Sequence, residues 1–145
     1  FAVRRMLETE MTRAFVRSST PAKLKVLRTH VASEAAALSA QDASGRTELL
    51  GDFHVRMAEL MGNDVLAQLL RDLISRCALI TLMYQSASEA AHSHEEHAEI
   101  VAALAARDEA LAVQLMHQHL EHVEASLIFD REQPVNELSL ALSPL

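Results

Sequence analysis

The chain contains few of the residues that sheets, turns and disulfides require. It has 145 residues, of which three are glycine, three proline, four phenylalanine, one tyrosine and one cysteine, and tryptophan is absent. Sheets favour β-branched and aromatic residues, whereas the abundant Ala, Leu, Met, Glu and Arg are strong helix formers. No proline lies between Ala22 and Gln133. Cys77 is alone, which excludes an internal disulfide and suits a reducing cytosol; we expect it in the core. The composition predicts an all-α fold.

Positive charge is also scarce. Thirteen Lys and Arg stand against twenty Asp and Glu, for a net charge of −7. Such a balance argues against direct binding of nucleic acid, which needs clustered basic residues. Seven basic residues nevertheless lie in the first 28 positions. They form either a solvated helix face or a face turned toward an acidic partner such as DNA held by a preceding domain. With no signal peptide and no membrane-spanning apolar run, we expect a cytoplasmic protein.

Hydrophobic residues recur at helical spacing in about six segments. We expect helices over 2–18, 21–40, 46–61, 64–85, 87–106 and 109–127, arranged as an antiparallel bundle. Ser86 to Glu89 and Ser93 to Glu96 are alternative capping boxes for the fifth helix. The fourth helix is apolar on nearly all sides, so we expect it at the centre of the domain. Residues 1–129 form the predicted domain, and residues 130–145, which contain Pro134 and Pro144, form a loose C-terminal tail.

Histidine is the residue type in this sequence that indicates a possible chemical function. Six of the eight histidines lie between positions 92 and 122. His54, His97 and His119 fall on or beside the apolar stripes of three different helices. A single inward histidine is usually a hydrogen-bonded core residue, but imidazoles from several helices can converge on a metal ion. On spacing alone both interpretations stay open.

The pattern of a catalytic site is missing. There is no G-x-S-x-G elbow and no H-E-x-x-H, and Cys77 lacks a reactive setting. A di-iron carboxylate bundle needs two Glu-x-x-His motifs, whereas only Glu89 to His92 forms one. We therefore do not expect an enzyme. The alternative hypothesis is a stand-alone metal-dependent helical-bundle enzyme or oxygen-binding protein.

Several short motifs, in order along residues 1–129, resemble the FCD (FadR C-terminal) domain of GntR-family transcription regulators. The segments are Arg4-Arg5-Met6-Leu7-Glu8, Asp52-Phe53-His54, Met61-Gly62-Asn63-Asp64-Val65-Leu66, Leu73-Ile74-Ser75-Arg76, Glu96-His97 followed by Ile100 to Leu104, and Asp108 with Leu115 to Leu120. Each motif is modest alone, but their order and spacing together are specific.

The resemblance implies a six-helix antiparallel bundle around an internal pocket. It implies a divalent metal ion, Zn²⁺ first with Ni²⁺ or Mn²⁺ as alternatives, held by His54, His97 and His119. The family's fourth ligand, an Asp one turn before the first histidine, is replaced here by Leu50. Asp52 lies about 200° around an ideal helix from His54 and is a poor substitute. A three-histidine site with open positions is still chemically sound, with lower metal affinity.

The resemblance also implies a function. The chain would be the ligand-sensing and dimerisation domain of a FadR-subfamily transcription regulator, binding a small organic acid and modulating DNA binding by a winged helix-turn-helix domain that precedes Phe1. The family's pocket arginine matches Arg4. Arg76 lies in the apolar fourth helix, where it would bind either the anionic effector or a buried or interface salt-bridge partner. We expect a symmetric homodimer, as suits near-palindromic operators.

Overall fold

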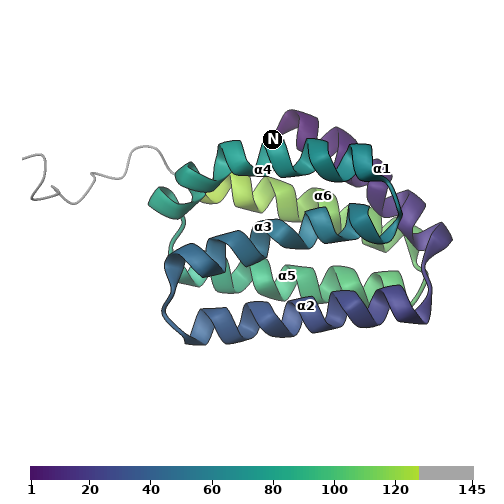
Figure 1. The fold of residues 1–145 in the computed structure, drawn as a ribbon, viewed down its shortest axis with the longest axis horizontal. Helices are drawn as coiled ribbons and strands as arrows, with labels where there is room; N and C mark the ends of the chain where they lie inside the picture. The colour runs from purple at the N-terminus through teal and green to yellow at the C-terminus, as the bar shows by residue number, and fades with distance from the viewer. Residues whose placement is uncertain (128–145) are drawn as a thin grey trace, which may run out of the picture.

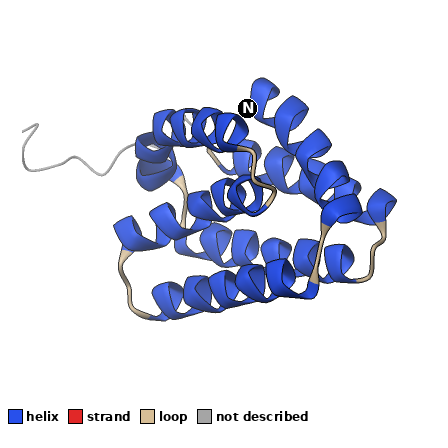
Figure 2. Cartoon of the chain, turned by 45° about the vertical axis from the view of Figure 1, so that its right-hand side comes forward, coloured by secondary structure: helices blue, strands red, loops and turns tan. Residues whose placement is uncertain are grey.

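The computed structural model describes residues 1–127 as six α-helices joined by short turns (Figures 1 and 2). The helices are α1 (Ala2–Ser18), α2 (Pro21–Ser39), α3 (Ala43–Leu60), α4 (Asp64–Tyr84), α5 (Ala87–Ala105) and α6 (Glu109–Ser126). The predicted all-α bundle is confirmed. The predicted tail, residues 130–145, lies outside the described residues. Among those that are described, no helix is long and apolar enough to cross a membrane.

The helix boundaries follow from local capping. Thr20 accepts a hydrogen bond from the Lys23 amide, with Pro21 at the first helical position, and Asn63 accepts one from Leu66. Gly62 ends α3 in the left-handed conformation at φ +71°, which glycine adopts without penalty. Of the two predicted capping boxes, Ser86 to Glu89 is formed. The second does not form, because Ser93 and Glu96 lie inside α5 and point into the bundle.

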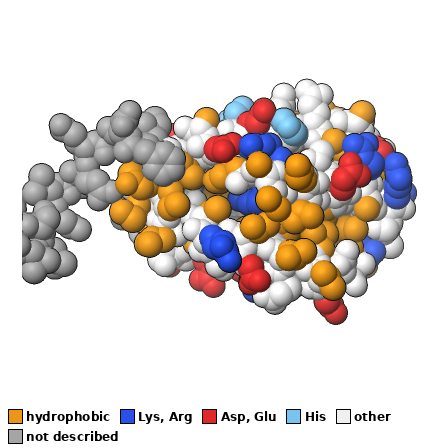
Figure 3. All heavy atoms as spheres, turned by 90° about the horizontal axis from the view of Figure 1, so that it is seen from above, with side chains coloured by type: hydrophobic (Ala, Val, Ile, Leu, Met, Phe, Trp, Pro, Cys, Tyr) orange, Lys and Arg blue, Asp and Glu red, His pale blue; other side chains and the backbone are white. Residues whose placement is uncertain are grey.

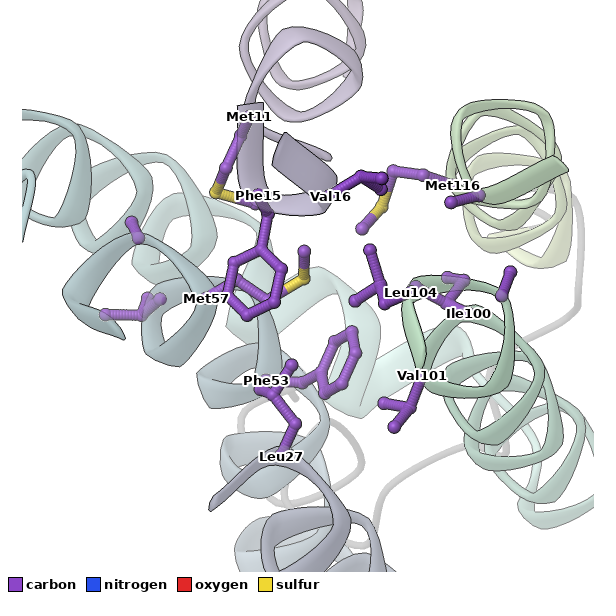
Figure 4. Close-up of a cluster of buried hydrophobic side chains, with 14 of the residues drawn as sticks. Met11, Phe15, Val16, Leu27, Phe53, Met57, Ile100, Val101, Leu104 and Met116 are labelled. Carbon is purple, nitrogen blue, oxygen red and sulfur yellow. The ribbon is translucent and has the colours of Figure 1, made fainter. Parts of the chain in front are cut away.

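The core lies mainly between α1, α2, α3, α5 and α6, and Ala67 and Leu70 of α4 extend it on one side. Side chains from all five helices point toward one another there, with Phe15, Phe53 and Leu27 fully buried (Figure 4). Helix α2 packs on α3 and α5, α6 packs on α1 and α5, and α3 also contacts α5 and α1. This arrangement turns the apolar faces of α3, α5 and α6 toward each other, and those are the faces that carry the three predicted metal ligands.

The expectation that the fourth helix is central is wrong. Helix α4 packs mainly on α3, touches α1 weakly, and lies on the outside of the bundle. Only Ala67 and Leu70 are buried, and large apolar side chains stay exposed: Val65, Leu69, Leu79, Ile80, Leu82 and Met83. Figure 3, which looks onto the side that carries α1 and α4, shows apolar side chains spread over this surface. The apolar pattern on all sides of α4 therefore belongs to a helix that packs one face on the bundle and exposes another face to solvent.

Helices α3 and α4 approach each other very closely at Gly51. A Cβ atom added at this position would lie 2.7 Å from Cγ2 of Ile74. Real side chains do not tolerate such a distance, so the glycine is what allows α4 to lie this near.

Candidate metal centre

His54, His97 and His119 meet inside the bundle, on α3, α5 and α6. Nε2 of His119 lies 3.1 Å from Nε2 of His97 and 3.3 Å from Nε2 of His54. All three side chains are at most 2 % exposed. The structure thus brings together the three residues that helical spacing singled out, and their ring nitrogens are close enough to share one ion.

A buried carboxylate contacts the other ring nitrogen of each histidine. Nδ1 of His54 lies 2.5 Å from Glu8, Nδ1 of His97 lies 2.8 Å from Glu34, and Nδ1 of His119 lies 2.7 Å from Glu96. The carboxylates come from α1, α2 and α5. Metal-binding histidines commonly donate their second N–H to a carboxylate, which fixes the tautomer and strengthens the ligand.

This arrangement fits a metal ion on chemical grounds. An imidazole that donates Nδ1–H to a carboxylate has only a lone pair on Nε2. If all three histidines donate in this way, three lone pairs face one another with no proton between them, an arrangement that a cation satisfies. Three histidines with open positions suit Zn²⁺, which supplies a Lewis-acidic attachment point for an anionic ligand.

Burial controls the protonation of the centre. Burial lowers the pKa of His54 to about 4, although Glu8 works in the opposite direction, and it lowers the pKa of His97 well below the ordinary value. Burial would raise the pKa of Glu8, but His54 and Arg4 outweigh it and bring the value to about 2. Burial raises the pKa of Glu34 to about 9, so at neutral pH this group is mostly a carboxylic acid, whose carbonyl oxygen can still accept from Nδ1 of His97. At neutral pH the imidazoles of His54 and His97 are therefore neutral, which is the form that binds metals.

Sequence analysis missed the three carboxylates, although a signal existed. Glu8 shares the inward face of α1 with Met11 and Phe15, and Glu34 follows Leu27 and Val31 at helical spacing. An acidic residue inside an apolar stripe needs a buried partner. Read together with the inward histidines, this pattern indicates carboxylate–histidine pairs.

A cavity of about 50 Å³ adjoins the histidines. Its walls include all three of them, Arg4, Leu50 and Gly51, and also Ile74, Cys77, Ala78 and Thr81 of α4. Cys77, expected in the core, is half-buried at this wall. The volume is well below the roughly 300–1,000 Å³ of typical ligand pockets, so it suits water molecules or a very small ligand.

The two predicted effector-binding arginines lie in different places. Arg4 is buried, lines the cavity, and donates from Nε to Oε1 of Glu8 at 2.7 Å. Arg76 is exposed on α4 and does not line this cavity. The structure therefore does not bring Arg76 to the site, because α4 is peripheral and Arg76 lies on its solvent side.

The basic residues near the N-terminus are largely engaged within the bundle. Arg5 contacts Glu124, and Arg13 and Arg17 contact Glu109, so α1 is tied to α6 by ion pairs. Such pairs at an exposed surface contribute about 0–1 kcal/mol each. These ion pairs explain part of the cluster of basic residues near the N-terminus without a nucleic-acid partner.

The family of the chain follows from its sequence match. The model of the FCD domain matches residues 1–122, which include the three histidines, the three carboxylates and Arg4. The chain belongs to the FCD domain family. The predicted resemblance is confirmed, and the FCD domain is a domain of regulator proteins. No curated protein and no solved structure matches the chain.

Leu50 of this FCD domain lies on the cavity wall one turn before His54, where the resemblance implied an Asp. Leu50→Asp is expected to tighten binding of Zn²⁺ by about tenfold or more, a change of about 1.4 kcal/mol, because it adds an anionic ligand beside the histidines. It should also lower stability, since Leu50 is buried. Isothermal titration with Zn²⁺ measures the affinity. Leu50→Asn is the uncharged control, and a Leu50→Asp variant that binds Zn²⁺ no more tightly than the parent would show that position 50 does not reach the ion.

Proposed function

We propose that this FCD domain is the effector-sensing part of a GntR/FadR-type transcription regulator, which binds a small organic acid at a divalent metal ion held by His54, His97 and His119. One observation carries the proposal: the same small cavity is lined by three convergent histidines and by a buried arginine. A carboxylate could reach the ion with one end while Arg4 holds the other. Zn²⁺ is the first candidate, with Ni²⁺ or Mn²⁺ as alternatives.

The contacts of Arg4 suggest how ion and effector would influence each other. Glu8 lies between Arg4 and His54, with one oxygen on each. An anion bound by the other N–H groups of Arg4 would place a second negative charge beside the guanidinium and weaken its bond to Glu8. The weaker bond would change how strongly Glu8 polarises His54. The signal would then pass to a winged helix-turn-helix domain in the full-length cytoplasmic protein by a shift between conformational states.

The effector proposal is tested by calorimetric titration of the Zn²⁺-loaded domain with a panel of small mono-, di- and hydroxycarboxylates. Arg4→Ala is expected to weaken binding of the selected acid by about ten- to a hundredfold, since a hydrogen bond to a charged group contributes about 1.5–3 kcal/mol. Arg5→Ala removes the neighbouring arginine, which pairs with Glu124 at the surface, and should leave the affinity unchanged. Equal affinity of the Arg4→Ala variant and the parent would refute the assignment of the pocket.

We further propose that the domain forms a symmetric homodimer through the exposed apolar face of α4. Six large apolar side chains on this helix are at least 37 % exposed. Contiguous exposed apolar patches usually mark interaction surfaces, and a two-fold dimer buries the same patch on both copies. Sedimentation at micromolar concentration should show a dimer for the parent chain and a monomer for a Leu79→Glu/Met83→Glu variant. A monomeric parent would contradict the proposal.

A further inference from the structure

A second group of side chains that could hold a metal ion lies at the surface, beside the buried centre. His92 and Glu96 are one turn apart on α5, and His122 approaches them from α6. Oε1 of Glu96 lies 3.2 Å from Nε2 of His92 and also contacts Nδ1 of His122. One ligand atom from each residue falls within 4.8 Å of the others. The spacing is close to what an ion with bonds of about 2 Å would gather.

The surroundings suit an ion with water in its open positions. The side chains of His92 and His122 are 57 % and 54 % exposed, whereas that of Glu96 is only 11 % exposed. Both histidines line a surface groove of about 300 Å³. The carboxylate of Glu96 is thus fixed below the surface, and the two exposed imidazoles above it are free to rotate toward an ion. Two histidines and one carboxylate form a donor set that borderline divalent ions accept.

The alternative is a set of surface ion pairs between protonated histidines and Glu96. Exposed pairs of this kind contribute little even when charged. A cation between two neutral imidazoles and a carboxylate would be bound much more strongly than these pairs, so metal binding separates the two explanations.

Glu96 also belongs to the buried centre. Its other oxygen, Oε2, accepts a hydrogen bond from Nδ1 of His119 at 2.7 Å. We propose that His92, Glu96 and His122 form a second, surface site for a divalent ion such as Zn²⁺, and that its occupation weakens metal binding at the buried histidines. The coupling rests on the proposed buried site, whereas the surface site does not.

The sign of the coupling follows from charge. An ion on Oε1 draws electron density from the carboxylate, so Oε2 becomes a poorer acceptor for His119 and His119 a poorer ligand. The two cations also repel each other. Coupling free energies are reciprocal, so the buried ion weakens the surface site by the same factor. The arrangement would let the domain respond to an excess of metal as well as to its effector.

Titration of the chain with Zn²⁺ alone, at pH 7.5 and without effector, tests the surface site. The parent is expected to bind two ions, and His92→Gln/His122→Gln is expected to lose the weaker one. The affinity of the remaining, tighter site should be unchanged, because that ion binds first while the surface site is empty. The coupling is expected in the His54→Ala variant, whose surface site should bind Zn²⁺ about fivefold or more tightly than the second ion of the parent, within the usual range of coupling between sites. His117→Gln removes another exposed α6 histidine, which pairs with Glu121, and should behave like the parent. An unchanged second site in the double variant, or a parent that binds one ion only, would overturn the proposal.

A His54→Ala variant distinguishes the two sites. It lacks a buried ligand and should keep the surface site while losing the tight one. If its tight binding of Zn²⁺ is unchanged, the assignment of the buried histidines as metal ligands is wrong. The surface site is then tested by the His92→Gln/His122→Gln variant alone. Should His54→Ala not fold, titration of the parent against a chelator of intermediate affinity separates the tight ion from the weak one.

Discussion

Replacement of His119 by alanine is expected to abolish tight binding of a divalent ion. His119 lies between the other two ligands, with its Nε2 within 3.3 Å of both. Loss of a partner that only supports a ligand typically costs about 10–100-fold in affinity, and loss of the ligand itself should cost more. Calorimetric titration with Zn²⁺ gives the affinity.

The matched control for His119→Ala is His117→Ala. His117 is two residues away on the same helix, is about half exposed, and lies 3.6 Å from a carboxylate oxygen of Glu121. This variant should bind the ion as tightly as the parent. If both variants kept the tight ion, the three convergent histidines would be core residues stabilised by their carboxylates and not a metal centre.

Glu8→Ala is expected to be strongly destabilising. Glu8 is fully buried between Arg4 and His54, and its removal leaves a buried guanidinium without its partner. Breaking one side of a buried ion pair typically costs about 3–5 kcal/mol. Urea unfolding monitored by circular dichroism measures the loss in the free energy of unfolding.

Two further variants serve as comparisons for Glu8→Ala. Glu10→Ala removes an exposed acid of the same helix that pairs with Arg13, and should cost about 0–1 kcal/mol. Glu8→Gln keeps an oxygen for Arg4 but loses the charge, so we expect an intermediate loss. A Glu8→Ala variant as stable as Glu10→Ala would mean that Arg4 finds solvent or another partner without cost.

The sequence alone predicts the helices and the three histidines well, because both depend on local rules. The caps at Thr20, Asn63 and Asp108 and the turn at Gly62 all involve neighbours along the chain. His54, His97 and His119 were found from the apolar stripe of each helix separately. A bundle in which those stripes face one another is enough to bring them together.

The parts that sequence analysis did not predict depend on how helices are placed relative to one another. Glu34 meets His97 from 63 residues away, and nothing in the local pattern of α2 names its partner. The apolar pattern on most sides of α4 predicts that Arg76 is buried, but it does not say which helix would cover it. In the structure the side of α4 that carries Arg76 faces solvent.

The close contact between Gly51 and Ile74 has a consequence for ligand choice. The three proposed metal ligands stand on α3, α5 and α6, whereas Ile74, Cys77, Ala78 and Thr81 of α4 form another part of the cavity wall. The space for a ligand is therefore set by the distance between α3 and α4. The strength of its attachment is set by the three histidines, whose mutual positions do not depend on that distance. If the domain binds an organic acid as proposed, a change of side-chain size along α4 alters which acids fit without disturbing the histidines. Selectivity and anchoring of the proposed effector are then physically separable.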